Sequence, residues 1–319
     1  MKKQFVDQLN KDDQVNDVFV LHKIDRKNYK NKPGTYLQLI LGDKTGTIIA
    51  KYWGSDENET EAIYKFFSDG EVFRISGKVG EYMGTLDISM NPGVKLEKIS
   101  DYDRSDLIPK TNKDIPQMIQ TFKDEISKVS NPHIKQLLES FSNDDAFMER
   151  YSTAPAAKKM HHDYIGGLLE HVLNLITTSK AVQSSHPKLD LDLLVAACIL
   201  HDIGKIDEYE VGLKIDFSDD GRFYGHINIG YRLVAKMIEN IPDFPKELER
   251  KILHMILSHH GELEYGSPVK PNFLEAVAFH HIDNTDATIQ HVKQMIEKEE
   301  GTKDWFYSGG REDRMFYTK

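Results

Sequence analysis

The chain has 319 residues, of which 39% are hydrophobic and 29% charged, with a formal net charge of −10 and a mean hydropathy of −0.51. This composition is that of a soluble globular protein long enough for about two domains. The longest apolar run, residues 193–200, is far shorter than the ~18 residues of a membrane span, so we expect no membrane insertion. The N-terminus lacks an apolar signal-peptide core, and the single Cys198 excludes an intramolecular disulfide. We therefore expect a cytoplasmic protein.

The charge is unevenly divided along the chain. Residues 1–100 hold 15 basic and 15 acidic residues, so the whole net charge of −10 lies in residues 101–319. Such a balance argues against non-specific attraction of the whole surface to phosphate backbones. It leaves open a nucleic-acid substrate that is drawn by a local basic groove or by bound metal cations.

Residues 1–100 have the pattern of a small β-barrel. β-branched and aromatic residues with partial alternation are separated by turn sequences such as KPG, GDKTG and SDG, and a helix is expected over residues 59–67. A helix between the third and fourth of five strands is typical of a Greek-key barrel of the OB type. The predicted strands are residues 19–24, 36–41, 47–53, 72–79 and 86–89.

The remaining chain reads as a linker, a helical domain and an aromatic tail. Residues 101–116 contain two prolines and many charges with little periodicity, which predicts a linker. Residues 117–300 then show helical periodicity and predict an all-α domain. Residues 301–319 are too aromatic for a disordered tail, so we expect them to dock on another surface. The helical signals are the apolar faces of Ile119, Phe122, Ile126 and Val129 and of Leu168, Val172, Leu173 and Ile176, with further helices near residues 189–200, 227–240, 245–260 and 272–299.

Histidines and aspartates at helix ends are the most informative feature of the sequence. In LLVAACILHDIGK, residues 193–205, an apolar helix ends in His201 and Asp202, followed by Gly204 and Lys205. A buried helix that delivers an imidazole and a carboxylate side by side offers two metal ligands from one rigid element. Gly204 is expected to let the backbone turn directly after them.

Other histidines and one aspartate join this pair as candidate ligands. Imidazoles together with carboxylates suit borderline divalent metals such as Mn, Fe, Co or Zn. A structural zinc site is not expected without thiolates, so the set favours catalysis. The further candidates are His171, His226, His259, His260 and Asp283.

In this order the motifs resemble a known superfamily. His171, His201-Asp202 and Asp283 match the H…HD…D pattern of the HD-domain metal-dependent phosphohydrolases, and His226 with His259-His260 matches the extra ligands of two-metal members. The sequences of four segments, which follow an OB-like barrel, are similar to those of the YhaM family of bacterial 3′-to-5′ exoribonucleases. The resemblance extends over nearly the whole chain. These segments are HHDYIGGLLEHVL (161–173), ILHDIGKIDEY (199–209), GHINIGYRL (225–233) and AVAFHHIDNTDA (276–287).

The resemblance implies a site and a reaction. In the superfamily pattern Asp202 bridges two metal ions, with His171, His201 and Asp283 around one ion and the other three histidines around the second. Two such ions lower the pKa of a shared water and clamp the phosphoryl group, so the attacking species would be a bridging hydroxide. Mn²⁺ is our first choice for the ion, with Co, Fe or Zn as alternatives that share these ligands.

Several residues of these motifs could have a structural role instead of a functional one. Lys205 either contacts a non-bridging phosphate oxygen in catalysis or is a solvated lysine. Asp286 is an alternative to Asp283 as the aspartate ligand, but we expect it to cap the helix or face solvent. His161 and His162 either approach the nucleic acid or cap a turn locally. The remaining histidines that we treat as structural are His254, His280, His281 and His291.

The barrel supplies candidates for binding single strands. OB barrels stack bases on exposed aromatic side chains beside a cationic groove. Because alternate aromatics usually fill the core of a small barrel, we expect only one or two of the five candidates to face nucleic acid. The aromatic candidates are Tyr36, Tyr52, Trp53, Phe73 and Tyr82, and the basic stretch comprises His22, Lys23, Arg26, Lys27, Lys30 and Lys32.

Three functions are compatible with these features. The first is a metal-dependent 3′-to-5′ exoribonuclease that releases nucleoside monophosphates from single-stranded RNA, with single-stranded DNA as a further substrate; its polarity and RNA preference are implied by the family resemblance. The second is a phosphohydrolase of small or cyclic nucleotides, which the absence of a GYP motif after the HD pair disfavours. The third is a catalytically inactive nucleic-acid-binding adaptor. A homo-oligomer is compatible with all three.

Overall fold

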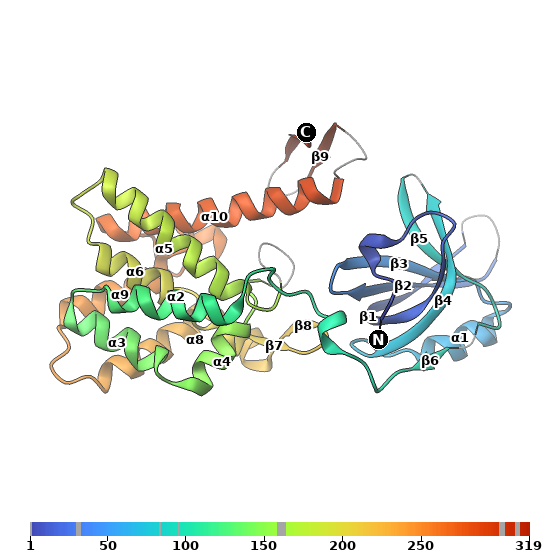
Figure 1. The fold of residues 1–319 in the computed structure, drawn as a ribbon, viewed down its shortest axis with the longest axis horizontal. Helices are drawn as coiled ribbons and strands as arrows, with labels where there is room; N and C mark the ends of the chain where they lie inside the picture. The colour runs from blue at the N-terminus through green and yellow to red at the C-terminus, as the bar shows by residue number, and fades with distance from the viewer. Residues whose placement is uncertain are drawn as a thin grey trace. The chain divides into compact units, whose positions relative to one another are not determined.

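The computed structural model describes residues 2–29, 33–82, 84–94, 96–157, 164–299, 304–309 and 313–319. The chain divides into two compact units (Figure 1). The first ends at Lys110 and also includes Val211–Lys214, and the second comprises Thr111–Glu210 and Ile215–Lys319. The boundary at Lys110 falls inside the predicted linker. Among the described residues, no helix has the length and apolar character that crossing a membrane requires.

The first unit is a closed five-stranded barrel. Its strand order is β1-β2-β3-β5-β4, and β4 pairs with β1 to close it; β3 and β5 are parallel, and the other pairs are antiparallel. Helix α1 (Glu57–Phe66) connects β3 to β4, as an OB barrel requires. All five predicted strands and the helix are confirmed. The strands are β1 (Gln14–Asn28), β2 (Thr35–Asp43), β3 (Gly46–Tyr52), β4 (Val72–Tyr82) and β5 (Thr85–Met90), with a short β6 (Glu97–Lys98) added beside β4.

The strand alternation that predicted the barrel also fills its interior. In β2, Leu37, Leu39 and Leu41 are fully buried while the residues between them are not. Strand β1 is long enough to pair with β4 through its first half and with β2 through its second half, with a shift of register between Leu21 and Lys23. Such a shift bends a strand and is a common device at the corner of a closed barrel.

The second unit is a bundle of helices around one fully apolar helix. Every residue of 193–200 in α6 is buried, and α3, α5, α9 and α10 pack around it. The predicted helices are confirmed, and α3, α4 and α7 are additional. The helices are α2 (Ile115–Ser127), α3 (Pro132–Ser142), α4 (Asp145–Thr153), α5 (Gly167–Ser185), α6 (Leu191–Leu200), α7 (Lys205–Glu208), α8 (Asp219–Glu239), α9 (Lys246–Ser258) and α10 (Leu274–Glu299).

The structure departs from the predicted organisation in three places. A short hairpin of β7 (Tyr209–Val211) and β8 (Ile215–Phe217) interrupts the stretch predicted to be all helical. The predicted linker is partly structured, because Leu107 is buried against Val18 and Val72 of the barrel and α2 already begins at its end. The described parts of the aromatic tail form a hairpin of β9 (Trp305–Ser308) and β10 (Arg314–Tyr317), whose larger aromatic side chains are about half exposed. The Ser308 hydroxyl donates to Sδ of Met295 at 3.1 Å, so the hairpin contacts α10 through this residue while its larger aromatic side chains stay exposed.

Candidate metal centre

The end of α6 places His201 and Asp202 at the centre of the helical unit. His201 is fully buried and Asp202 is 3% exposed. Gly204 has an ordinary helical conformation, so the expectation that it is needed for a turn is wrong. It is needed for packing: a Cβ at Gly204 would lie 2.1 Å from the carbonyl oxygen of His226 and 2.6 Å from the backbone nitrogen of Gly230. The missing side chain lets α8 approach closely enough to bring His226 beside Asp202.

Three of the predicted ligands meet on one side of Asp202. His171 comes from α5, His201 from the end of α6 and Asp283 from α10, and their ligand atoms all lie within 4.8 Å of one another. The Oδ1 atom of Asp283 is 3.1 Å from Nε2 of His171 and 3.8 Å from Nε2 of His201. Three separate helical segments of the chain thus supply one cluster of two imidazoles and a carboxylate.

The other three predicted ligands meet on the opposite oxygen of Asp202. His226 from α8, and His259 and His260 just after α9, form a second group whose ligand atoms lie within 4.8 Å of one another. Asp202 Oδ1 is 3.4 Å from Nε2 of His226 and 3.7 Å from Nε2 of His259. Its Oδ2 atom is 3.1 Å from Nε2 of His201 in the first cluster. One carboxylate therefore presents an oxygen to each cluster.

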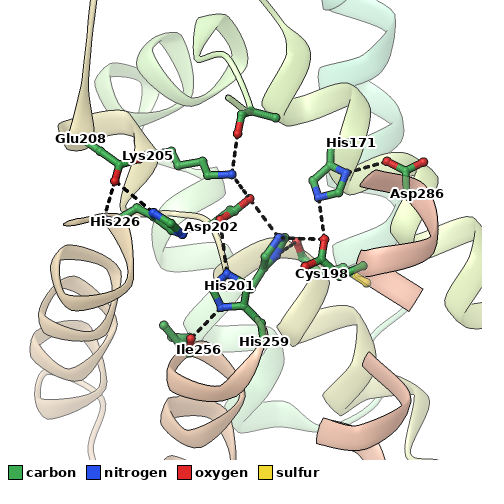
Figure 2. A network of polar contacts seen from close by, with 12 residues as sticks. His171, Cys198, His201, Asp202, Lys205, Glu208, His226, Ile256, His259 and Asp286 are labelled. Carbon is green, nitrogen blue, oxygen red and sulfur yellow. Dashed lines mark hydrogen bonds and ion pairs between the residues drawn. The ribbon is translucent and has the colours of Figure 1, made fainter. Parts of the chain in front are cut away.

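The buried atoms at the centre have the character of metal ligands. Within the described part of the chain, Nε2 of His201, His226 and His259 and Oδ1 of Asp202 are buried without a hydrogen-bond partner. Leaving such atoms unpaired costs about 1–3 kcal/mol each. In Figure 2, these side chains converge from different helices. Three imidazole nitrogens and a carboxylate oxygen are a donor set that fits borderline divalent cations.

Each imidazole is held by its other nitrogen. Nδ1 of His226 is 3.0 Å from the carboxylate of Glu208, Nδ1 of His259 is 2.7 Å from the carbonyl of Ile256, and Nδ1 of His260 is 2.9 Å from the carbonyl of Tyr265. Because these partners only accept, Nδ1 donates and Nε2 keeps the lone pair that a metal needs. Nδ1 of His171 likewise faces Asp286, and that of His201 faces the carbonyls of Ala197 and Cys198.

Burial and neighbouring charge shift the pKa values in this centre. Burial alone would lower the pKa of His171, but hydrogen bonds to Asp283 and Asp286 outweigh it and raise the pKa to about 9. Burial would raise the pKa of Asp202, yet the nearby charges of His201 and Lys205 hold it well below its ordinary value. Burial lowers the pKa of His259 far below that of a free imidazole. Asp202 therefore stays charged and His259 neutral, the states in which both can coordinate a cation.

Lys205 is buried and not solvated. Its side chain is buried, and its Nζ atom donates to Asp202 Oδ2 at 2.6 Å and to the carbonyl of Ala156 (Figure 2). The solvated reading is therefore wrong. The ammonium group is engaged with the central carboxylate, and its contact with a substrate phosphate stays a prediction.

Two residues of the centre were not predicted. Asp286 was expected to cap or face solvent, but its side chain is 13% exposed and its Oδ2 atom lies 2.7 Å from Nδ1 of His171 (Figure 2). Its spacing of three residues from Asp283 on one helix was the available signal. Glu208, one helix turn beyond Lys205, had no comparable signal. His161 and His162 lie outside the described residues.

On the barrel, the aromatic candidates separate into exposed and buried side chains. Tyr36 and Trp53 are half-buried and lie against each other with ring centroids 4.9 Å apart, and Tyr29, which we did not predict, completes a three-ring cluster. Tyr82 is 65% exposed. Tyr52 and Phe73 are core residues, so their assignment as base-stacking platforms is wrong; the Tyr52 hydroxyl donates to Glu59 at 2.7 Å.

The basic residues of β1 are largely paired with acids. Lys23 lies 2.7 Å and Lys27 3.7 Å from the carboxylate of Asp25, and Arg26 pairs with Glu61 and Glu57 of α1. All three side chains are exposed. His22 is instead partly buried, and this burial lowers its pKa. Lys30 and Lys32 are outside the described residues. The cationic surface beside the aromatic cluster is therefore weaker than the sequence suggested.

The comparisons with known proteins agree with this architecture. The model of the HD domain matches residues 168–288, which include both clusters, so the helical unit is an HD domain. The chain is 32% identical to a 3′-5′ exoribonuclease YhaM of Geobacillus sp. over 88% of this chain and 85% of that protein, and 34% identical to that of Shouchella clausii over 88% and 86%. The chain belongs to the YhaM family.

Two solved structures are similar to part of the chain. One is the OB domain of a Thermoplasma acidophilum protein, with 20% identity over 28% of this chain and 78% of that chain and a TM-score of 0.22. Another is a domain of replication protein A from Methanococcus maripaludis, with 20% identity over 30% and 93% of the two chains and a TM-score of 0.24.

Proposed function

We propose that this protein is a metal-dependent 3′-to-5′ exoribonuclease that shortens single-stranded RNA to nucleoside monophosphates, accepts single-stranded DNA as well, and acts in the cytoplasm. The observation that carries the proposal is the set of buried, unpaired Nε2 and carboxylate atoms around Asp202 in a chain that belongs to the YhaM family. The relatives named above supply the reaction class and its direction, and the side chains supply the site.

The donor set supports two cations, one in each cluster, with Asp202 between them. His171, His201 and Asp283 would hold one ion, and His226, His259 and His260 the other. Two divalent ions at such a site lower the pKa of a water and neutralise charge on the phosphoryl oxygens. Mn²⁺ is our first choice because imidazole and carboxylate ligands suit it, with Co, Fe and Zn as alternatives.

The protein's own groups hold this arrangement in place. Lys205 fixes Asp202, and Glu208 and Asp286 fix the rings of His226 and His171. Because these contacts exist before substrate arrives, no reorganisation is needed during the reaction. The carboxylates carry negative charge that would repel RNA without cations, so metal removal should weaken both binding and turnover.

The barrel would capture the single strand. Tyr36 and Trp53, together with Tyr29, offer a half-exposed aromatic surface for base stacking. Exposed Lys23, Arg26 and Lys27 lie on strand β1, but their pairing with acids limits the attraction to phosphate. We therefore expect transient capture that depends on stacking more than on charge.

The test combines activity with metal counting. Metal-reconstituted protein is incubated with 5′-labelled single-stranded RNA, labelled single-stranded DNA and cyclic dinucleotides; a ladder of 5′-labelled products of decreasing length supports the proposal. Hydrolysis of cyclic dinucleotides alone would overturn it in favour of a small-nucleotide phosphohydrolase, and binding without product would indicate an inactive adaptor.

The metal assignment is tested separately by variants. Asp202→Asn should lower turnover by about 10³-fold or more while the circular dichroism spectrum stays that of the wild type. His226→Ala and His171→Ala should each reduce the bound metal from two ions to one per chain. Wild-type metal content in both variants would contradict the two-cluster assignment.

A further inference from the structure

Large apolar side chains are exposed in the chain segments next to two ligands of the second cluster. Phe223 on α8 is 82% exposed and lies three residues before His226. Tyr265, at the end of the short 3-10 helix Leu263–Tyr265, is 58% exposed and lies five residues after His260. Leu263 at the start of the same turn is 59% exposed. Exposed apolar groups gathered beside a site mark a surface that contacts a ligand or partner.

Phe223 is held in a fixed relation to the ligand His226. The first turn of α8 lies directly on Glu208, since a Cβ at Gly221 would be 2.3 Å from the Glu208 carbonyl oxygen. The Glu208 carboxylate in turn accepts from the backbone nitrogen of His226 at 2.9 Å. Gly225, with φ of 68° and ψ of 156°, interrupts the helix between Phe223 and His226. The two residues are therefore not related by regular helical geometry.

Tyr265 is tied to the ligand His260 in the same way. Its carbonyl oxygen lies 2.9 Å from Nδ1 of His260, so the residue that orients this ligand also carries the exposed ring. The turn is closed by Gly266 at φ of 83° and by the hydroxyl of Ser267, which donates to the carbonyl of Leu257. Neither aromatic segment can shift without disturbing an imidazole of the cluster.

The two segments that carry these rings also hold the two partly exposed imidazoles of the second cluster. His201 and His259 are fully buried, whereas His226 and His260 are partly exposed and lie with ring centroids 5.3 Å apart. A phosphodiester that reaches the second cluster past these two imidazoles carries its flanking nucleotides out toward α8 and the 263–265 turn. Aromatic rings on that path offer π-faces that any base can use, which suits removal of nucleotides without regard to sequence.

We propose that Phe223 and Tyr265 are positioning residues that stack on the bases of the nucleotides flanking the scissile phosphodiester of a single strand. The proposal rests on the exoribonuclease function proposed above and names how that site holds its substrate. Phe223 is preferred over its neighbour Tyr224, because the guanidinium of Arg232 already lies 5.8 Å from the Tyr224 ring.

The test uses the full-length, metal-loaded protein and three kinds of substrate. Phe223→Ala and Tyr265→Ala should each raise KM for single-stranded RNA about 5- to 150-fold with kcat changed little, since one lost stacking contact corresponds to this range. Phe223→Trp should keep the wild-type KM, and Phe223→Leu should not. Turnover of an oligomer made only of abasic ribose phosphates, which has no aromatic ring, should be unchanged in all variants.

An RNA with abasic residues at its last two 3′ positions isolates the contact. On this substrate the wild-type KM should rise and the effect of Phe223→Ala should disappear, because the base that the ring contacts is gone. Ile289→Ala, which removes an exposed apolar side chain of α10, is the matched control and should have no effect. Metal content is measured for each variant to show that both clusters remain intact.

The outcomes separate the two proposals. Suppose that the wild type shortens RNA. If both alanine variants then keep the wild-type KM, or if their KM rises as much on abasic RNA as on normal RNA, the stacking role is wrong and the exoribonuclease function stands. If the metal-loaded wild type does not shorten RNA, the proposed function fails and the stacking role fails with it.

Discussion

The Nδ1 atom of His171 lies 2.7 Å from Oδ2 of Asp286, so a carboxylate outside both clusters sets the direction of a candidate metal ligand. The other oxygen of Asp286 accepts from the side-chain amide of Asn174 at 3.3 Å, which fixes the carboxylate itself. Such a partner selects the Nδ1–H tautomer and makes Nε2 a stronger ligand.

Asp286→Ala should therefore weaken metal binding in the first cluster by about 10- to 100-fold without removing a ligand. The measurement is isothermal titration of the metal-free protein with Mn²⁺, in which the weaker of two binding steps should belong to the altered cluster. Asp145→Asn, an exposed acid in the first turn of α4, should leave both steps unchanged. Equal metal affinity in Asp286→Ala and wild type would show that the contact does not tune His171.

Lys205 should matter most when no metal is bound. Its ammonium group donates to the buried Asp202 carboxylate, so Lys205→Met removes this ion pair, leaves only the neighbouring imidazoles beside the carboxylate, and should destabilise the metal-free protein by about 3–5 kcal/mol. Metal ions would compensate the same carboxylate, so the loss in their presence should be smaller. Urea denaturation with and without a chelator measures both values.

The control for this variant is Lys246→Met, which breaks an exposed pair with Glu249 and should cost about 0–1 kcal/mol in either condition. A Lys205→Met protein with wild-type stability but a raised KM would mean that Lys205 contacts substrate phosphate instead of fixing Asp202.

Much of the metal centre could be predicted because its ligands sit in short motifs with strong local patterns. The apolar run 193–200 predicted a buried helix, and its last residues predicted a rigid pair of ligands at His201 and Asp202. Glu208 could not be found in this way, because its contact with His226 depends on how α7 packs against α8. The role of Gly204 was misjudged for the same reason: a close approach between two backbones leaves no trace in local sequence.

On the barrel, the sequence identified aromatic residues but did not predict whether each side chain points into the core or out to solvent. Tyr52 pairs directly with Leu37 across β2 and β3, so it shares the inward face of the barrel with that leucine. Tyr36, one position earlier on β2, therefore points away from the core. Strand register decides between these two tyrosines, and register was not available from the sequence alone.

Substitutions of these two tyrosines should have distinct effects. Tyr36→Ala should weaken the binding of single-stranded RNA by about 1–3 kcal/mol and leave the melting temperature of the barrel nearly unchanged. Tyr52→Ala removes a buried ring and its hydrogen bond to Glu59, and should destabilise the protein by about 3–5 kcal/mol. Fluorescence anisotropy with a labelled oligonucleotide and thermal denaturation separate the two. Weaker binding with unchanged stability in Tyr52→Ala would contradict its place in the core.

The buried histidines predict how the stability of the metal-free protein depends on pH. Burial lowers the pKa of His259 and His260, so below about pH 6.5 the unfolded chain takes up protons that the folded chain does not, and stability falls. His171 has the opposite sign: its folded-state pKa of about 9 gives a contribution that is complete below pH 6.5 and is lost as the pH rises through 9. Together, these two effects make the contribution of the three histidines to the free energy of unfolding largest near pH 6.5.

His259→Leu tests the acid side of this profile. Each histidine kept neutral by folding contributes a slope of about 1.4 kcal/mol per pH unit below its unfolded pKa, so the variant should lose about this much of the slope between pH 6 and pH 5. Urea denaturation in the presence of a chelator gives the free energy of unfolding at each pH, with His186→Gln at an exposed site as the control. An acid slope in His259→Leu equal to that of the wild type would show that His259 accepts a proton in the folded protein, and it would then be a poor candidate for a ligand that must coordinate in its neutral form.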